Sequence, residues 1–189
     1  MRRSLISSAA IAALLLSGGA SAGTDVPLAP FKAIGLHGGG DVVLRHGDVQ
    51  RVTLLKGSTQ FTTFTVKDGS LDISACNDSC PHEYDLQIEI VSPEIDAVAV
   101  HGGGDIKAEG SFPSVNSLAV AVHGGGDLDL RAIPASHVAA AVHGGGDIST
   151  TATVSLVAAV SGGGDITYWG NPDVKQAVSG GGDVSHATQ

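Results

Sequence analysis

The chain has 189 residues, of which 42% are hydrophobic, 4% aromatic and 15% charged, and its formal net charge at pH 7 is −9. A chain of this length suits one domain. The negative charge disfavours binding to nucleic acid or to anionic lipid. It would attract cations or a basic partner, although it also serves solubility.

The first 22 residues are predicted to be a secretory signal peptide. The basic start MRR precedes an apolar run, LISSAAIAALLL, and the small residues ASA form a cleavage site before Gly23. The apolar run is too short for a good transmembrane helix. Cleavage would remove Arg2 and Arg3 but no acid, so the net charge would change from −9 to −11. We therefore expect an exported mature domain over residues 23–189, in the periplasm, at the outer membrane or outside the cell.

Residues 42–96 are predicted to form irregular strands at the N-terminal end of the fold. The stretch VVLRHGDVQRVTLL is typical of a β-hairpin with its turn at residues 46–48. FTTFTVKDGSLDISA is typical of a second hairpin that turns at KDGS, and YDLQIEIVSP alternates as a further strand does. The strand before this region, FKAIGLHGGGD, is expected to stack beside DAVAVHGGGD.

Two cysteines, Cys76 and Cys80, lie in the segment CNDSCPH. An exported protein usually oxidises such a pair, so the spacing predicts a disulfide that pins a hairpin tip or a turn. A metal site that uses Cys76, Cys80 and His82 is the alternative.

A five-residue motif recurs six times. It is HGGGD at residues 37–41, 101–105, 123–127 and 143–147, and SGGGD at 161–165 and 179–183. The last five copies recur every 18 to 22 residues, which is typical of a solenoid with one coil per repeat, so regular repeats are expected over residues 97–186. Turns on the far side of the coils are expected at Pro134 and at residues 170–172.

The residues that flank each motif predict strands. In DAVAVHGGGDIK, the side chains of Val98, Val100 and Ile106 share the buried side, whereas His101 and Asp105 face outward. The following repeats have the same pattern. Eighteen of the 27 glycines lie in the six motifs. Three consecutive glycines allow a bend that a Cβ would forbid and a close approach of neighbouring repeats, so we expect them to form corners.

This order of features resembles the head GIN domain family of auto-transporter adhesins. The resemblance rests on LRHGDVQRVTL, VKDGSLDI, the repeated corners and the ending YWGNPDVKQAVSGGGDVS, and it covers about residues 31–186. It implies a right-handed β-helix-like fold in the bacterial envelope and little chemistry. Many relatives have a small residue before the corner, as in SGGGD, so the resemblance does not explain the histidines. The predicted fold is an all-β, single-domain parallel β-helix or β-solenoid with irregular N-terminal hairpins.

Stacked repeats would place the motif aspartates in one column. Neighbouring carboxylates about 4.8 Å apart repel by roughly 0.9 kcal/mol in water. Hydrogen bonds from glycine N–H groups of the same or the next corner would relieve this repulsion, and bound cations are the other possibility. The column contains Asp41, Asp105, Asp127, Asp147, Asp165 and Asp183.

A second column would contain the four motif histidines. Imidazole and carboxylate are suitable ligands for Zn²⁺ or Cu²⁺. The candidate metal ligands are His37, His101, His123, His143, Asp41, Asp105, Asp127 and Asp147, and the remaining two, Asp165 and Asp183, would be structural corner carboxylates. The histidines could equally be surface or hydrogen-bonding residues, or could neutralise the aspartates in a way that depends on pH near 6 to 7.

Catalysis is disfavoured. Ser, His and Asp are present, but no G-x-S-x-G motif places a nucleophile beside its base. One Trp and two Tyr are few for a β-helix enzyme that grips a sugar. Calcium-binding RTX rolls carry two Gly-Asp nonapeptides per coil, whereas this chain has one such motif per coil.

The sequence therefore favours an exported, non-catalytic binding or adhesion module of the bacterial envelope. Its partner would be a glycan or a protein of the envelope. The alternatives are a periplasmic Zn or Cu binder, and a structural or assembly module. The outward alanines of AVAV and VAAAV would form a flat strip, which is expected to pack against the N-terminal hairpins or, in a homo-oligomer, against a second copy.

Overall fold

The computed structural model describes residues 23–77 and 79–188. The predicted signal peptide, residues 1–22, lies outside the described residues. The described part contains fifteen β-strands and no helix. It accordingly holds no helix of the length and apolarity needed to cross a membrane.

The strands are β1 (Thr24–Asp25), β2 (Ala33–Gly38), β3 (Asp41–His46), β4 (Arg51–Lys56), β5 (Thr63–Lys67), β6 (Ser70–Ser74), β7 (Gln87–Ser92), β8 (Ala97–Gly102), β9 (Asp105–Glu109), β10 (Val115–Gly124), β11 (Leu128–Gly144), β12 (Ile148–Gly162), β13 (Ile166–Trp169), β14 (Asp173–Gly180) and β15 (Val184–His186). The longest strands, β11 and β12, lie in the repeats.

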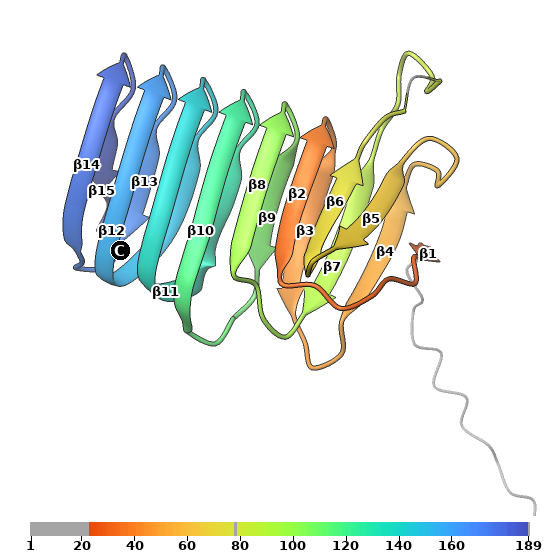
Figure 1. Cartoon of the computed structure of the whole chain (residues 1–189), viewed down its shortest axis with the longest axis horizontal. Helices are drawn as coiled ribbons and strands as arrows, with labels where there is room; N and C mark the ends of the chain where they lie inside the picture. The colour runs from red at the N-terminus through yellow and green to blue at the C-terminus, as the bar shows by residue number, and fades with distance from the viewer. Residues whose placement is uncertain (1–22, 78, 189) are drawn as a thin grey trace, which may run out of the picture.

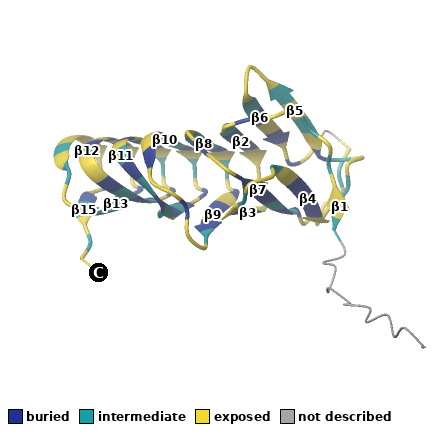
Figure 2. Ribbon diagram, turned by 90° about the horizontal axis from the view of Figure 1, so that it is seen from below, coloured by how far each residue is buried: buried dark blue, intermediate teal, exposed yellow. Residues whose placement is uncertain are grey.

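The chain passes back and forth between two layers of parallel strands (Figures 1 and 2). The front layer contains, in order, β2, β8, β10, the second halves of β11 and β12, and β14. The back layer contains β3, β9, the first residues of β11 and β12, β13 and β15. Each GGGD motif leads from the front layer to the back layer. Because β11 and β12 continue through both layers, the whole is one mostly parallel sheet that curls back on itself.

The register of the front layer aligns all six motifs. His37 pairs with His101, His101 with His123 and His123 with His143, and the column continues through Ser161 and Ser179. The predicted stacking of FKAIGLHGGGD beside DAVAVHGGGD is therefore confirmed, as is the all-β, mainly parallel architecture. The right-handed sense of winding stays a prediction.

The hydrophobic core lies between the two layers. Val100, Val122 and Val142 of the front layer are 0% exposed, and Ile106 and Ile148 of the back layer are 1% exposed. This is the burial that the alternating sequence predicts. Burial of each such side chain contributes about 1.5–3 kcal/mol relative to an exposed position, so the repeated columns are the main source of stability.

Two of the three glycines in each corner are required by the geometry. Gly124 has φ +133°, which an L side chain rarely adopts, and a Cβ on Gly126 would lie 2.0 Å from the carbonyl oxygen of Gly104 in the previous repeat. A Cβ on the middle residue, Gly125, would meet nothing within 4 Å. The predicted bend and close approach are thus confirmed for the first and third glycines, whereas the middle glycine is free of such contacts.

The first predicted hairpin is wrong. Strand β3 does not pair with β4, because β7 lies between them, parallel to β3 and antiparallel to β4. The alternating Ile88 and Ile90 of β7 supply buried side chains to this part of the core, so the strand nearest in sequence is displaced from β3 by a later one. The second hairpin is confirmed, since β5 and β6 pair antiparallel around Asp68 and Gly69.

The predicted change of direction at Pro134 is present, but as a bend within β11 and not as a turn between two strands. Pro134 lies inside β11, where the pairing with β12 shifts register between Leu130 and Pro134. A bulge of this kind bends a strand without ending it, and proline is tolerated there because the ladder is already interrupted. The turn predicted at residues 170–172 is confirmed, because these residues connect β13 to β14.

Candidate functional site

The four motif histidines form a stacked ladder on the outer side of the front layer. Ring centroids lie 4.7 Å apart for His37 and His101, 4.7 Å for His101 and His123, and 4.9 Å for His123 and His143. The planes of neighbouring rings differ by 5°, 8° and 1°. The parallel register produces this stack directly, since each histidine occupies the same position in its strand.

The stacked geometry does not favour a shared metal ion. An imidazole nitrogen binds a metal in the plane of its ring, at about 2.0–2.1 Å for Zn²⁺. Parallel rings whose centroids are 4.7–4.9 Å apart do not direct two nitrogens at one point between them. Within residues 23–77 and 79–188, no group of three or more His, Cys, Asp or Glu side chains is arranged to hold a metal ion. The metal hypothesis thus gains no support from the geometry.

The pKa of His101 is lowered within the ladder. Partial burial lowers the pKa of this imidazole below its usual 6.5, the neighbouring His37 and His123 lower it further, and Asp72 acts in the opposite direction. At one end of the ladder, Nε2 of His37 lies 3.3 Å from Oδ1 of Asp72. The ladder therefore opposes protonation at its second position.

The aspartate column is held by side-chain-to-backbone hydrogen bonds. The carboxylate of each aspartate accepts the backbone N–H of the aspartate in the next repeat, at 2.8–2.9 Å. The four bonds join Asp105, Asp127, Asp147, Asp165 and Asp183 in that order. The predicted carboxylate bonding is thus present, but its donor is an aspartate N–H and not a glycine N–H.

Asp41 does not take part in this chain of bonds. It pairs with Asp105 in the back layer, but the N–H of Asp105 donates to the carbonyl oxygen of Gly40, at 2.9 Å. Asp165 and Asp183 belong to the same hydrogen-bonded series as the aspartates that were predicted as metal ligands. All five aspartates of the series therefore have the same structural role, which is to link one repeat to the next.

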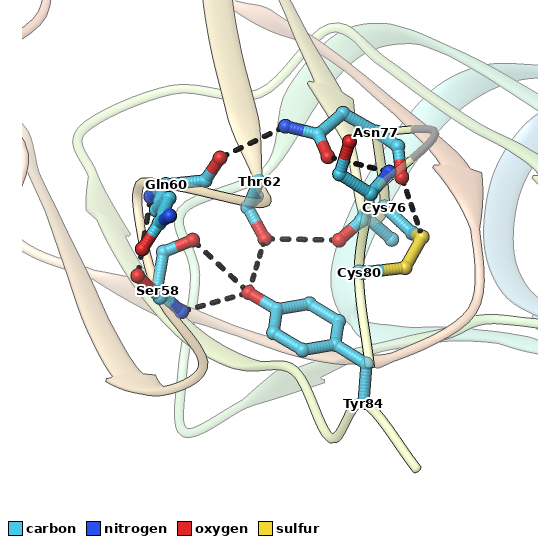
Figure 3. The surroundings of a disulfide bond; sticks show 9 residues. Ser58, Gln60, Thr62, Cys76, Asn77, Cys80 and Tyr84 are labelled. Atoms are coloured by element: carbon cyan, nitrogen blue, oxygen red, sulfur yellow. Dashed lines mark hydrogen bonds between the residues drawn. A yellow bond between two sulfur atoms is a disulfide. The ribbon is translucent and has the colours of Figure 1, made fainter. Parts of the chain in front are cut away.

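Cys76 and Cys80 form a disulfide, as predicted. Neither sulfur is then available for the alternative site with His82. Figure 3 shows that the neighbouring Tyr84 joins two loops: its hydroxyl accepts the N–H of Ser58 at 2.7 Å and is 2.7 Å from Oγ1 of Thr62. These contacts indicate that the disulfide and Tyr84 hold the two N-terminal loops together.

The alanine strip is not an internal packing surface. Ala119, Ala139 and Ala159 on the outer side of the front layer are exposed, and Ala99 and Ala141 are partly exposed. The β5–β6 hairpin rises beside this layer and does not lie over it (Figure 2). The packing predicted against the N-terminal hairpins is therefore wrong, because those hairpins extend the sheet sideways by strand pairing.

An open groove, not predicted from the sequence, lies at the edge opposite the corners, where the front-layer strands begin. Its volume is about 960 Å³, within the range of ligand-binding clefts. Its apolar lining comes from Pro30, Phe31, Pro93, Pro113 and Val115. We call it the loop groove. One signal could have indicated it: a proline precedes each of the front-layer strands β2, β8 and β10 by two to four residues.

The wall of the loop groove is fixed by a side-chain amide. Oε1 of Gln50 accepts the N–H of Phe31 at 3.0 Å, and Nε2 of Gln50 donates to the carbonyl oxygen of Phe31 at 2.7 Å. The same Nε2 donates to Oγ of Ser92 at 2.9 Å, and Ser92 donates to the carbonyl oxygen of Glu94 at 3.0 Å. These hydrogen bonds thus tie three connecting segments together.

Comparison with known proteins places these features in a family. The model of a family described as "Putative auto-transporter adhesin, head GIN domain" matches residues 30–116 and 102–172. No curated protein matches the chain.

The chain is also similar to several solved structures. A putative adhesin from Bacteroides fragilis superposes with a TM-score of 0.54 at 20% identity, over 87% of this chain and 96% of the other. A putative adhesin from Parabacteroides distasonis is 18% identical, with a TM-score of 0.42 over 87% and 96% of the two chains. A putative cell adhesion protein from Clostridium sporogenes is 13% identical, with a TM-score of 0.44 over 87% and 100%. At 20% identity, the likeness to the Bacteroides fragilis protein concerns the fold alone.

Proposed function

Because this chain belongs to the head GIN domain family of auto-transporter adhesins, we propose that it is an exported, non-catalytic adhesion module that engages an envelope partner through its loop groove. The observation that carries the proposal is the groove itself. It is open, has a largely apolar floor, and its walls are joined by the hydrogen bonds of Gln50. Such preorganisation lowers the entropic cost of docking a partner.

The chemistry of the groove supports binding and not catalysis. Its titratable groups are four carboxylates and one lysine, and no histidine or cysteine of the described chain lines it. General acid–base and nucleophilic catalysis usually depend on a base held against a nucleophile. The residues of this groove offer apolar contact and surface charge, which are the means by which interfaces achieve affinity and specificity.

Export is part of the proposal. The predicted signal peptide over residues 1–22 would direct the chain out of the cytoplasm. The disulfide between Cys76 and Cys80 supports this destination, because such bonds persist in oxidising compartments. The proposed location is therefore the periplasm, the outer membrane or the cell surface.

The proposal is tested by binding of fluorescently labelled residues 23–189 to intact bacterial cells and spheroplasts, measured by flow cytometry with unlabelled protein as competitor. We expect saturable binding that Ser114→Trp, which fills the loop groove, weakens at least fivefold. Ser111→Trp is the matched control, since Ser111 is exposed on the same loop but does not line the groove. An absence of saturable binding, or equal weakening by both variants, would count against the proposal.

A second candidate function is self-assembly through the C-terminal end of the sheet. Strand β14 pairs only with β12, so one edge of eight residues is unpaired among the described strands. Val178 there is 42% exposed, whereas its counterparts Val142 and Val160 are 0% and 2% exposed. An unpaired edge beside an uncovered core position is suited to pairing with a second copy, although Lys175 on the same strand opposes this.

Sedimentation velocity over about a hundredfold range of concentration tests this candidate. Association that Val178→Lys abolishes, and that Val157→Lys does not, would support it. Val157 is 53% exposed on the neighbouring strand β12, away from the free edge. A monomer at every concentration would remove assembly from consideration.

A further inference from the structure

The loop groove carries more negative charge than positive charge. Four carboxylates line it, those of Asp48, Asp68, Glu94 and Asp96, against the single ammonium of Lys32. Nζ of Lys32 lies 2.5 Å from the carboxylate of Glu94, so these two charges compensate each other. The side chains of the other three acids make no hydrogen bond or ion pair with the described residues.

The unpaired carboxylates come from separate loops that the backbone holds together. Asp68 and Gly69 form the two-residue turn between β5 and β6, with φ values of 51° and 78°, as a type I′ turn requires. The carbonyl oxygen of Gly69 accepts the N–H of Lys32 at 2.9 Å, and the N–H of Asp96 donates to the carbonyl oxygen of Lys32 at 2.8 Å. Two acidic loops are thus anchored to one residue.

The floor between these carboxylates is apolar, which narrows the class of ligand. A bare metal ion or a small cation would pair with a carboxylate but would leave the exposed Pro93 and Pro113 uncovered. Nucleic acid and anionic lipid would be repelled. A peptide with cationic side chains among aliphatic or proline residues satisfies both features, because charge-assisted hydrogen bonds form at the rim while apolar side chains cover the floor.

Building on the function proposed above, we infer that the loop groove binds a basic peptide segment of a partner protein. Lysine or arginine side chains of that segment pair with Asp48, Asp68 and Asp96, and its apolar residues lie against Pro93, Pro113 and Val115. The groove volume of about 960 Å³ accommodates several residues of an extended chain. Binding of this kind weakens as salt rises, since rim charges are screened over about 8–10 Å at physiological ionic strength.

The test uses two peptides and two variants of residues 23–189. The probe is a fluorescein-labelled dodecapeptide that contains lysine, valine and proline in equal numbers, and the comparison peptide has glutamate in place of each lysine. The groove variant carries Asp48→Asn, Asp68→Asn and Asp96→Asn. Asparagine tolerates the left-handed conformation at position 68, so the turn is kept. The control variant loses the same charge outside the groove, through Glu83→Gln, Asp173→Asn and Asp183→Asn.

Fluorescence anisotropy at physiological salt gives the affinities, and circular dichroism establishes that both variants are folded. We expect the lysine peptide to bind at least tenfold more tightly than the glutamate peptide. The groove variant should lose at least tenfold and the control variant less than twofold. No saturable binding of the lysine peptide, or equal loss in both variants, would overturn the inference. If cell binding persists when the peptide fails, only this inference is wrong, and if both fail, the proposed function is wrong too.

Discussion

The carboxylate of Asp105 accepts a hydrogen bond from the backbone N–H of Asp127, with 2.9 Å between oxygen and nitrogen, and so joins one repeat to the next. The same relationship recurs three more times toward the C-terminus, at 2.8 Å. A carboxylate acceptor makes each bond stronger than one between neutral groups. These hydrogen bonds offset the repulsion between the stacked carboxylates. Each carboxylate provides an acceptor for the aspartate N–H of the next corner.

This relationship predicts that Asp127→Ala destabilises the fold more than Asp183→Ala. The first change leaves the N–H of Asp147 without its carboxylate acceptor, at a cost of about 0.5–1.5 kcal/mol because the bond lies at the exposed surface. The carboxylate of Asp183 accepts no hydrogen bond within the described residues, so its removal should cost less than about 0.5 kcal/mol. Urea unfolding followed by circular dichroism measures both. Equal losses would mean that the bonds between repeats contribute little.

The corner geometry predicts different effects for alanine at neighbouring glycines. Gly126→Ala brings a Cβ within 2.0 Å of the carbonyl oxygen of Gly104, which is backbone and cannot move aside, so we expect a loss above about 2 kcal/mol in the free energy of unfolding. Gly125→Ala meets nothing within 4 Å and should change stability by less than about 1 kcal/mol. Thermal melts of the two variants provide the comparison, and a Gly125→Ala variant as unstable as Gly126→Ala would contradict the assignment of roles.

The repeats were predictable from the sequence because short stretches of sequence determine both their strands and their alignment. A period of two residues identifies which side of a strand is buried, as for Val98 and Val100, and a fixed motif identifies which residues align between coils. The neighbour of β3 was not predictable in this way. Its partner β7 begins 41 residues after β3 ends, and the nearer strand β4 has an equally suitable alternating pattern.

The candidate site was less predictable than the fold for a related reason. The histidine and aspartate columns are visible in one motif, but their chemistry depends on ring orientation and on which N–H lies nearest each carboxylate. The loop groove is formed by loops of unequal length, whose lining residues run from Pro30 to Asn116. Three of these loops contain a proline, but those that supply Asp48 and Asp68 do not. Only their convergence in space, through contacts such as that of Gln50 with Phe31, makes them one surface.

The stacked ladder predicts that stability declines in mild acid. The pKa of His101 is lowered in the folded chain, chiefly by partial burial and then by His37 and His123, so the unfolded chain binds a proton more readily. Its contribution to stability is complete above the ordinary pKa of about 6.5 and is lost as the pH falls below that value toward the folded pKa. His101→Ser, the residue at this position in the last two repeats, should reduce the fall in melting temperature between neutral and acidic pH.

The control for this prediction is His82→Ser, which removes an exposed histidine outside the ladder. Melting temperatures at closely spaced pH values between about 7.5 and 5 would show a steeper decline in the native chain and in His82→Ser than in His101→Ser, since the unfolded histidine titrates in this window. An identical decline in all three proteins would show that carboxylates elsewhere determine the acid sensitivity.

The ladder geometry finally predicts that the histidine column does not bind Zn²⁺ or Cu²⁺ in the micromolar range or tighter. Rings whose planes differ by only 1–8° direct their nitrogens along parallel lines, and the carboxylates of Asp105 and Asp127 accept backbone N–H groups of the next repeat. Calorimetric titration of untagged residues 23–189, beside a variant with His101, His123 and His143 changed to Ser, measures this. If the native chain binds tightly and the variant does not, the histidine rings must leave their stacked arrangement to bind the metal. The protein would then be an envelope metal binder. Equal weak binding in both would leave the ladder as a consequence of register, with the groove at the opposite edge as the surface that engages the partner.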